Sequence, residues 1–143
     1  MSAPASPTDL DQPDQPKDAA MTDTITTPTP DAPRTLSLNA EPIRLTTDRA
    51  VSLGVIVTEL VSNACKYAYP SRAGEVRVAL NQDGDGHFVL AVEDDGIGMV
   101  PGAAPRGTGL GTKLIRAMAQ SLQSGVTYDP AHAGVRATLR AAL

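Results

Sequence analysis

The feature that most constrains the fold is the stretch at residues 53–69, which reads LGVIVTELVSNACKYAY. Apolar residues recur there at three- and four-residue steps, the period of an amphipathic helix. The predicted apolar surface consists of Val51, Val55, Leu60, Val61, Ala64, Cys65 and Ala68. A second, polar set falls on one side of the same helix: Ser52, Glu59, Asn63 and Lys66. Two interpretations stay open, a core helix with one wet edge or a helix that presents polar groups to a ligand.

Length and cysteine content set the broad class of the chain. A chain of 143 residues suggests one domain, long enough to bury a core without covalent staples. The single cysteine, Cys65, cannot form an internal disulfide and is interpreted as a small buried hydrophobic residue. The sequence contains no apolar run long enough for a membrane span and no secretory signal pattern. We therefore expect a cytoplasmic protein without direct membrane contact.

Charge and composition separate an N-terminal segment from the rest. Residues 1–35 carry six of the 16 acids but only two of the 12 bases, so the remainder is neutral. This segment is rich in Pro, Thr, Ser, Asp and Ala, which predicts a disordered tail at 1–35 and an ordered domain at 36–143. Met21 is a possible alternative start. Without a basic field or an aromatic platform, the sequence predicts no nucleic-acid partner.

The order of predicted elements indicates an α+β fold. Alternation at 36–38 and 43–45 predicts a short hairpin or two edge strands, and Thr46 or Thr47 is expected to cap the long helix. Pro70 ends that helix near Tyr69. Strands are predicted at 75–80 and 87–93 around a turn at 83–86, then a helix at 108–122, then strands at 126–128 and 135–141. Antiparallel pairs dominate, so we expect the helices to cover one face of the sheet.

A glycine-rich run, Gly107-Thr108-Gly109-Leu110-Gly111, precedes the second predicted helix. Free backbone N–H groups and the positive end of the helix dipole favour a phosphate there, although such turns are common. The GxxxxGK[ST] run of a P-loop is absent. A Rossmann fingerprint is excluded as well, because no strand directly precedes these glycines.

A second motif, Asp94-x-Gly96-x-Gly98, follows an apolar strand. One interpretation is a turn in which Asp94 or Asp95 accepts hydrogen bonds from its own backbone. The other is a carboxylate that accepts a hydrogen bond from a ligand amino group, beside glycines that leave space for a flat ring. The motif alone does not decide between them.

Three segments in this order, ELVSNACKY, EDDGIGM and RGTGLG, resemble the nucleotide-binding core of the GHKL ATPases. Within that superfamily the chain resembles the catalytic domain of a bacterial sensor histidine kinase, of the HWE type or a related one. The resemblance covers roughly residues 36–143. It implies a two-layer α/β sandwich with a mixed, mostly antiparallel sheet covered on one face by helices.

The resemblance also implies roles for individual residues. Asn63 matches the Mg²⁺ ligand, Glu59 the acid beside the attacking group, and Lys66 a phosphate contact. Asp94 matches the aspartate that reads the adenine amino group, and Tyr67 a residue that flanks the adenine or ribose. The remaining implied ATP-binding positions are Gly96, Gly98, Arg106, Gly107, Thr108, Gly109, Leu110 and Gly111. Lys113 flanks the glycine loop, where Arg106 and Lys113 either add positive charge or are simply solvated.

The implied activity is a protein-histidine kinase of two-component signalling, which transfers the γ-phosphoryl group of Mg·ATP to a histidine. The two histidines, His87 and His132, lie in a predicted strand and a predicted turn, unlike a phosphoacceptor on a helical hairpin. The acceptor is therefore expected on another domain or partner chain, with a response regulator as the next partner. Two alternatives stay open: an anti-sigma-type serine/threonine kinase and a non-catalytic ATP-binding regulatory module.

Overall fold

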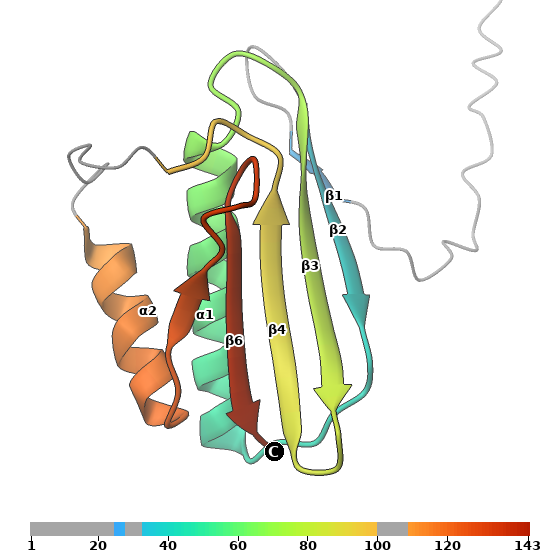
Figure 1. Ribbon diagram of the computed structural model, residues 1–143, viewed down its shortest axis with the longest axis vertical. Coiled ribbons are helices and arrows are strands. Elements are labelled where there is room, and N and C mark those ends of the chain that lie inside the picture. The colour runs from blue at the N-terminus through green and yellow to red at the C-terminus, as the bar shows by residue number, and fades with distance from the viewer. Residues whose placement is uncertain (1–24, 28–32, 100–108) are drawn as a thin grey trace, which may run out of the picture.

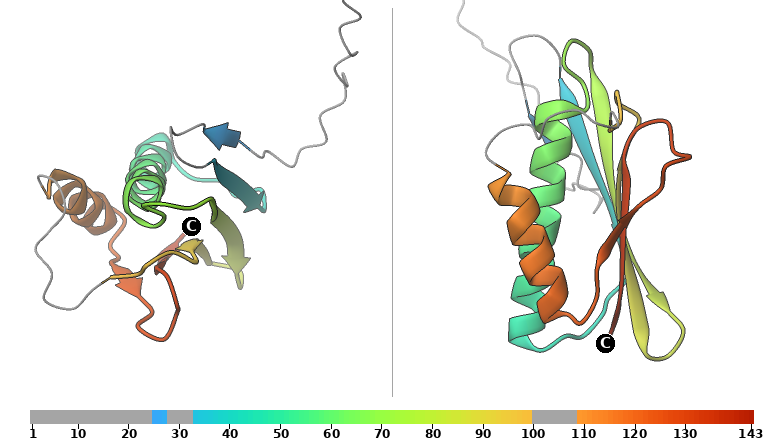
Figure 2. Two further views of the ribbon diagram at one scale, coloured as in Figure 1. Left: turned by 90° about the horizontal axis from the view of Figure 1, so that it is seen from above. Right: turned by 60° about the vertical axis from the view of Figure 1, so that its left-hand side comes forward.

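The fold, described here from a computed structural model, is a sheet with two helices packed on one face (Figure 1; Figure 2). The structure describes residues 25–27, 33–99 and 109–143. Over these residues the sheet has six strands in the order β1-β2-β3-β4-β6-β5. The strands are β1 (Ile25–Thr27), β2 (Arg34–Ala40), β3 (Gly74–Asp83), β4 (His87–Asp94), β5 (Val126–Tyr128) and β6 (Arg136–Ala142). The helices are α1 (Thr47–Tyr67) and α2 (Leu110–Ser121). The predicted α+β sandwich is confirmed.

Strand alternation places the core between the sheet and the helices. In the register, Val78 lies opposite Val92 and Val92 lies opposite Ala137, and all three side chains are buried. Because successive side chains of a strand point to opposite faces, this apolar set lies on the helix-covered face. The predicted hairpin of β3 and β4 is confirmed, with Gly84 in the left-handed conformation (φ 69°) in its turn. The predicted pair of C-terminal strands is also confirmed.

Of the two N-terminal strands predicted as a hairpin or as edge strands, the one at 36–38 is confirmed as part of β2 and the one at 43–45 is wrong. β2 pairs with β3 in parallel, and residues 43–45 form no strand. Two parallel strands cannot be joined by a tight turn and need a crossover connection, which α1 provides here. Residues 41–46 carry the chain from the end of β2 to the start of this helix, and Ile43 and Leu45 pack against the core.

The long helix α1 has the predicted extent, but its faces are rotated relative to the prediction. Leu53, Ile56, Leu60 and Ala64 are buried against the sheet, whereas Val51 is 59 % exposed. Ser52, predicted on the polar side, is buried and its Oγ lies 2.8 Å from Ser121 Oγ of α2. The second helix therefore covers part of the side expected to face water. Thr46 occupies the N-cap position, as expected of Thr46 or Thr47, but its side chain makes no capping hydrogen bond.

The second helix is shorter than predicted and is anchored toward its C-terminal end. Ile115, Ala119 and Leu122 are buried, whereas Leu110 and Leu114 are exposed although their spacing predicted a core role. Figure 2 shows α2 beside α1, where the two helices run in opposite directions. The N-terminal end of α2 thus lies beside the C-terminal half of α1.

Most of the segment predicted to be disordered lies outside the described residues. Within it, residues 25–27 form β1, which pairs antiparallel with β2, and Arg34 opens β2. The tail and domain boundary otherwise stay predictions. Cys65 is half-buried, and burial raises the pKa of its thiol. No helix among the described residues is both long and apolar enough to cross a membrane.

Candidate functional site

Three segments that are distant in the sequence meet at one end of the molecule. Figure 1 shows the C-terminal end of α1, the end of β4 and the N-terminal end of α2 at the same end of the sandwich. These segments contain Glu59, Asn63 and Lys66 of α1, the Asp94 motif, and Gly109 and Gly111, whereas Ser52 lies at the other end of α1. The fold therefore brings together the regions that the sequence singled out separately.

Glu59 and Asn63 lie directly beside the start of α2. A β-carbon placed on Gly111 would lie 2.8 Å from Glu59 Oε2 and 3.7 Å from Asn63 Oδ1. Both side chains are half-buried and stand one turn apart on α1. Only a glycine allows the backbone of α2 to approach the Glu59 carboxylate this closely without displacing it. Gly111 and the side of α1 that carries Glu59 and Asn63 thus form one surface.

The oxygen atoms of this surface suit a hard cation only in part. Carboxylate and amide oxygens are the ligands that Mg²⁺ accepts, usually one or two of them together with waters and phosphate oxygens. Among the described residues no group of three His, Cys, Asp or Glu side chains could hold a metal ion. The donor set around Asn63 therefore fits an ion that is held mainly by the phosphates of a ligand.

Asp94 ends β4 and is 2 % exposed. Its Oδ1 accepts hydrogen bonds from the backbone N–H groups of Gly96, at 2.9 Å, and Val135, at 3.3 Å. No donor to Oδ2 and no ion pair of this carboxylate is found within the described residues. Oδ2 is not among the buried side-chain atoms that lack a hydrogen-bond partner, so it stays accessible and can accept a donor from a ligand.

The loop after Asp94 is attached to the end of α1. Ile97 N donates to the carbonyl oxygen of Ala68 at 2.9 Å, and a β-carbon on Gly96 would lie 2.2 Å from that same oxygen. Gly98 has φ 75°, a left-handed conformation that favours glycine. The first glycine motif is therefore required for its backbone geometry, and it ties Asp94 to the helix that carries Asn63.

For the other predicted site residues, the structure gives little beyond position and exposure. Lys66 is exposed in the last turn of α1, and Tyr67 is half-buried as the last residue of that helix. Gly109 adopts the left-handed conformation (φ 72°) just before α2, Leu110 is 67 % exposed, and Lys113 is exposed. Arg106, Gly107 and Thr108 lie outside the described residues. The roles inferred for all of these residues stay predictions.

The turn between β5 and β6 supports the Asp94 loop, which sequence reasoning did not anticipate. His132 Nε2 lies 2.8 Å from the carbonyl oxygen of Asp94. A β-carbon on Gly134 would lie 2.1 Å from that carbonyl oxygen and 2.6 Å from Asp94 Oδ1. The only sequence signal was a Pro/His/Gly turn, which gives no indication of its partner in space.

Asp95, next to Asp94, is held by two basic side chains, Arg77 of β3 and Arg72 of the segment before β3. Arg77 donates to both of its carboxylate oxygens, at 2.8 and 2.9 Å, and Arg72 donates to its carbonyl oxygen at 2.7 Å. The hydrogen bonds from Arg77 are the main cause that lowers the pKa of Asp95 below its ordinary value. Asp95 is thus a charged anchor of the loop, while Asp94 faces inward.

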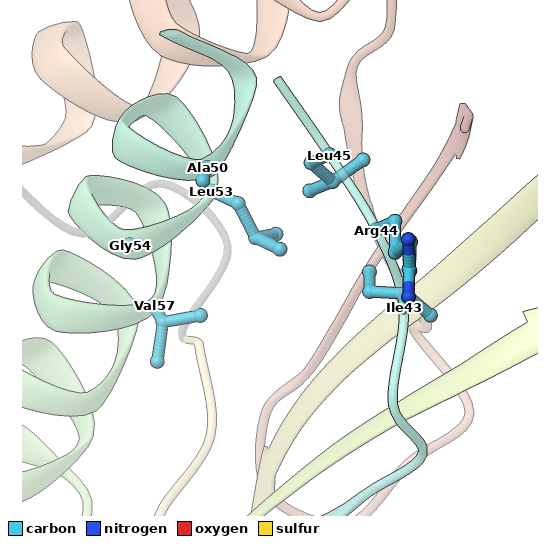
Figure 3. A pocket seen from close by; sticks show the side chains of 7 residues that line it. All are labelled: Ile43, Arg44, Leu45, Ala50, Leu53, Gly54 and Val57. Carbon is cyan, nitrogen blue, oxygen red and sulfur yellow. The ribbon is translucent and has the colours of Figure 1, made fainter. Parts of the chain in front are cut away.

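An open pocket of about 690 Å³ lies elsewhere, at the N-terminal half of α1 (Figure 3). Leu53 and Val57 of the helix face Ile43 and Leu45 of the preceding segment across this space. Its lining is almost entirely aliphatic, with Arg44 as its one charged residue. It contains none of the predicted site residues and offers no carboxylate or amide to a nucleotide.

Comparison with known proteins bears on the family and the fold of the chain. Residues 48–143 match the family model described as histidine kinase-, DNA gyrase B- and HSP90-like ATPase. The sensor histidine kinase PdtaS of Mycobacterium tuberculosis is 30 % identical over 83 residues, which cover 57 % of this chain. The match spans only 17 % of the length of PdtaS.

Solved structures show the same fold. The histidine kinase domain of the blue-light activated histidine kinase EL346 from Erythrobacter litoralis superposes with a TM-score of 0.68 at 22 % identity, covering 76 % of this chain and 51 % of that domain. The mycobacterial sensor histidine kinase MprB gives 0.64 at 22 % identity, covering 76 % and 83 %. Because the family model matches about two thirds of the sequence, the chain belongs to the histidine kinase-, DNA gyrase B- and HSP90-like ATPase family.

Proposed function

We propose that this chain binds Mg·ATP between α1, the Asp94 loop and the start of α2, and transfers the γ-phosphoryl group to a histidine of another domain or chain. The observation that carries the proposal is Asp94, a carboxylate that is 2 % exposed and has one oxygen engaged by two backbone N–H groups. The other oxygen is left for the amino group of adenine. Family membership and the likeness to PdtaS support the kinase assignment.

In this proposal different elements contact the adenine and the triphosphate of the nucleotide. Asp94 accepts a hydrogen bond from the adenine amino group, beside the space cleared by Gly96 and Gly98. The triphosphate lies toward Asn63 and the glycine-rich start of α2, where the positive end of the helix dipole favours an anion. Lys66 adds positive charge near the phosphates. Positioning and charge neutralisation, rather than covalent chemistry on the protein, are what phosphoryl transfer requires.

Glu59 and Asn63 have different proposed roles at the phosphate end of the nucleotide. Asn63 Oδ1 would hold Mg²⁺, which when bound offsets negative charge on the phosphate oxygens. Glu59 lies beside it and is placed to accept a proton from, or orient, the attacking imidazole. The absence of a side chain at Gly111 leaves room for this carboxylate beside the start of α2, which supports its proposed place near the phosphates.

Nucleotide titration tests the binding half of the proposal. With a fluorescent ATP analogue and Mg²⁺, we expect Asp94→Asn to weaken binding by at least about tenfold, because a neutral amide cannot reproduce the acceptor pair. Asn63→Ala should weaken binding in Mg²⁺ and have little effect in EDTA. Arg116→Gln, a change at an exposed position of α2, is the control. Affinities for both site variants equal to that of the unaltered chain would refute the site.

Phosphotransfer tests the other half. The chain is incubated with γ-labelled ATP and candidate helical hairpins that carry a histidine. We expect label on the hairpin that is lost in acid and kept in base, as for phosphohistidine, and no label with Glu59→Ala. Acid-stable label on a serine or threonine would contradict the histidine assignment, and nucleotide binding without any transfer would favour a regulatory module.

A further inference from the structure

The peptide that follows Asp94 is held by two side chains from outside the strand. The carbonyl oxygen of Asp94 accepts from His132 Nε2 at 2.8 Å, and the next N–H, of Asp95, donates to the Tyr69 hydroxyl at 2.8 Å. Tyr69 is itself fixed, because its hydroxyl donates to the carbonyl oxygen of Glu75 at 2.6 Å and its side chain is 1 % exposed. The orientation of this one peptide therefore depends on His132 and Tyr69.

His132, in the β5–β6 turn, is largely buried against the Asp94 loop. Its side chain is 12 % exposed, and Nε2 also lies 3.7 Å from Asp95 Oδ1. The Asp95 carboxylate is fixed in turn by the two hydrogen bonds from Arg77. A carbonyl oxygen can only accept, so Nε2 must carry the proton that it donates to Asp94. His132 thus links the β5–β6 turn to the main chain of the base-reading residue.

The direction of the Asp94 carboxylate follows from that main chain. Oδ1 is held by Gly96 N–H and Val135 N–H. If the carbonyl of Asp94 loses its donor, the 94–95 peptide can rotate. That rotation shifts Gly96 N–H, one of the two donors that orient the carboxylate. Hydrogen bonds weaken steeply with misalignment, so a small rotation reduces the contact to a ligand amino group.

We propose that His132 is a positioning residue that sets which purine Asp94 accepts. By fixing the Asp94 peptide it holds Oδ2 toward a purine with an amino group at C6, and against a purine with a carbonyl oxygen there. This inference rests on the proposed function. It assigns a determinant of base selection to a turn that lies 38 positions beyond Asp94 in the sequence.

The test compares ATP with ITP, in which a carbonyl oxygen replaces the C6 amino group. The full 143-residue chain is titrated with each nucleotide in competition with a fluorescent ATP analogue and Mg²⁺. His132→Leu removes the donor, and His132→Asn keeps a polar group that is too short to reach the carbonyl. His132→Gln restores an N–H donor at a similar reach. His87→Leu, at the opposite end of β4, is the matched control.

We expect the preference for ATP over ITP to fall about fivefold in His132→Leu and His132→Asn, the size expected for loss of one buried hydrogen bond. His132→Gln and His87→Leu should keep the ratio of the unaltered chain. A residue with a merely structural role would weaken both nucleotides equally and leave this ratio unchanged. Thermal unfolding of each variant shows that folded proteins are compared.

An unchanged ATP-to-ITP ratio in folded His132→Leu or His132→Asn overturns the inference, provided that Asp94→Asn abolishes the preference. If Asp94→Asn also leaves the ratio unchanged, or if the unaltered chain binds neither nucleotide, the proposed function fails and the inference fails with it. The two failures are therefore distinguishable in one set of titrations.

Discussion

The candidate site depends on the absence of a β-carbon at Gly134. A β-carbon there would lie 2.1 Å from the carbonyl oxygen of Asp94 and 2.7 Å from Gly96 N, both backbone atoms. Backbone atoms cannot swing away as the end of a flexible side chain can. We therefore expect Gly134→Ala to reduce the free energy of unfolding by about 2 kcal/mol through overpacking, and to weaken nucleotide binding as well.

Gly86→Ala is the matched control, since nothing lies within 4 Å of a β-carbon at Gly86. Urea unfolding of both variants gives the stabilities, and the fluorescent ATP titration gives the affinities. Equal stability and affinity in the two alanine variants would show that the turn does not define the Asp94 loop.

At the residue scale the sequence was informative where a motif combined chemistry with spacing. Asp94, Gly96 and Gly98 could be singled out because an acid at a strand end with two glycines is a recognisable pattern. His132 and Gly134 could not, because their importance comes from the segment across from them. The residue types around position 132 do not indicate that this turn packs against the end of β4.

At the element scale, strands β3, β4 and β6 carry a row of charges on the helix-free face. Arg77 lies opposite Glu93, Glu93 lies opposite Arg136, and both arginines bond Glu93. The hydrogen bond from Arg136 is the largest cause that lowers the pKa of Glu93, and those from Arg77 lower the pKa of Asp95. The row therefore ties three strands together beside the Asp94 loop.

This row predicts how stability depends on pH. A carboxylate whose pKa is lowered by folding stabilises the protein above its unfolded pKa, and that contribution is lost as pH falls through the folded pKa. Stability should thus decline from about pH 5 to about pH 3. Arg77→Gln should make the decline shallower by under about 1 kcal/mol, since Asp95 is largely exposed and screened by solvent.

Urea unfolding between pH 3 and pH 7 measures this dependence, with Arg116→Gln as a variant of equal charge change on exposed α2. An Arg77→Gln profile parallel to that of Arg116→Gln would show that the row contributes nothing specific to stability.

Elements with local signals were predictable, and pairings between distant segments were not. The period of α1 and the Asp-Gly turn between β3 and β4 lie within short windows of sequence. The parallel pairing of β2 with β3 joins segments separated by a whole helix, and residues 43–45 alternate like a strand without forming one. The rotation of α1, which buries Ser52 and exposes Val51, depends on where α2 packs.

At the scale of the whole molecule, α1 joins the two ends of the candidate site. Its C-terminal half carries Glu59 and Asn63 beside α2, and Ala68, just past its end, holds the Asp94 loop through Ile97 N–H. Its N-terminal half lines the separate aliphatic pocket of Figure 3. Of these two regions along α1, only the first offers polar groups suited to a purine triphosphate.

The most direct test is a crystal structure of this chain with a non-hydrolysable ATP analogue and Mg²⁺. We predict that the adenine amino group lies within hydrogen-bond distance of the Asp94 carboxylate, and that the triphosphate extends to Asn63 and the start of α2. An analogue bound in the aliphatic pocket beside Leu53 and Val57, or bound with Asp94 and Asn63 both out of contact, would contradict the assignment.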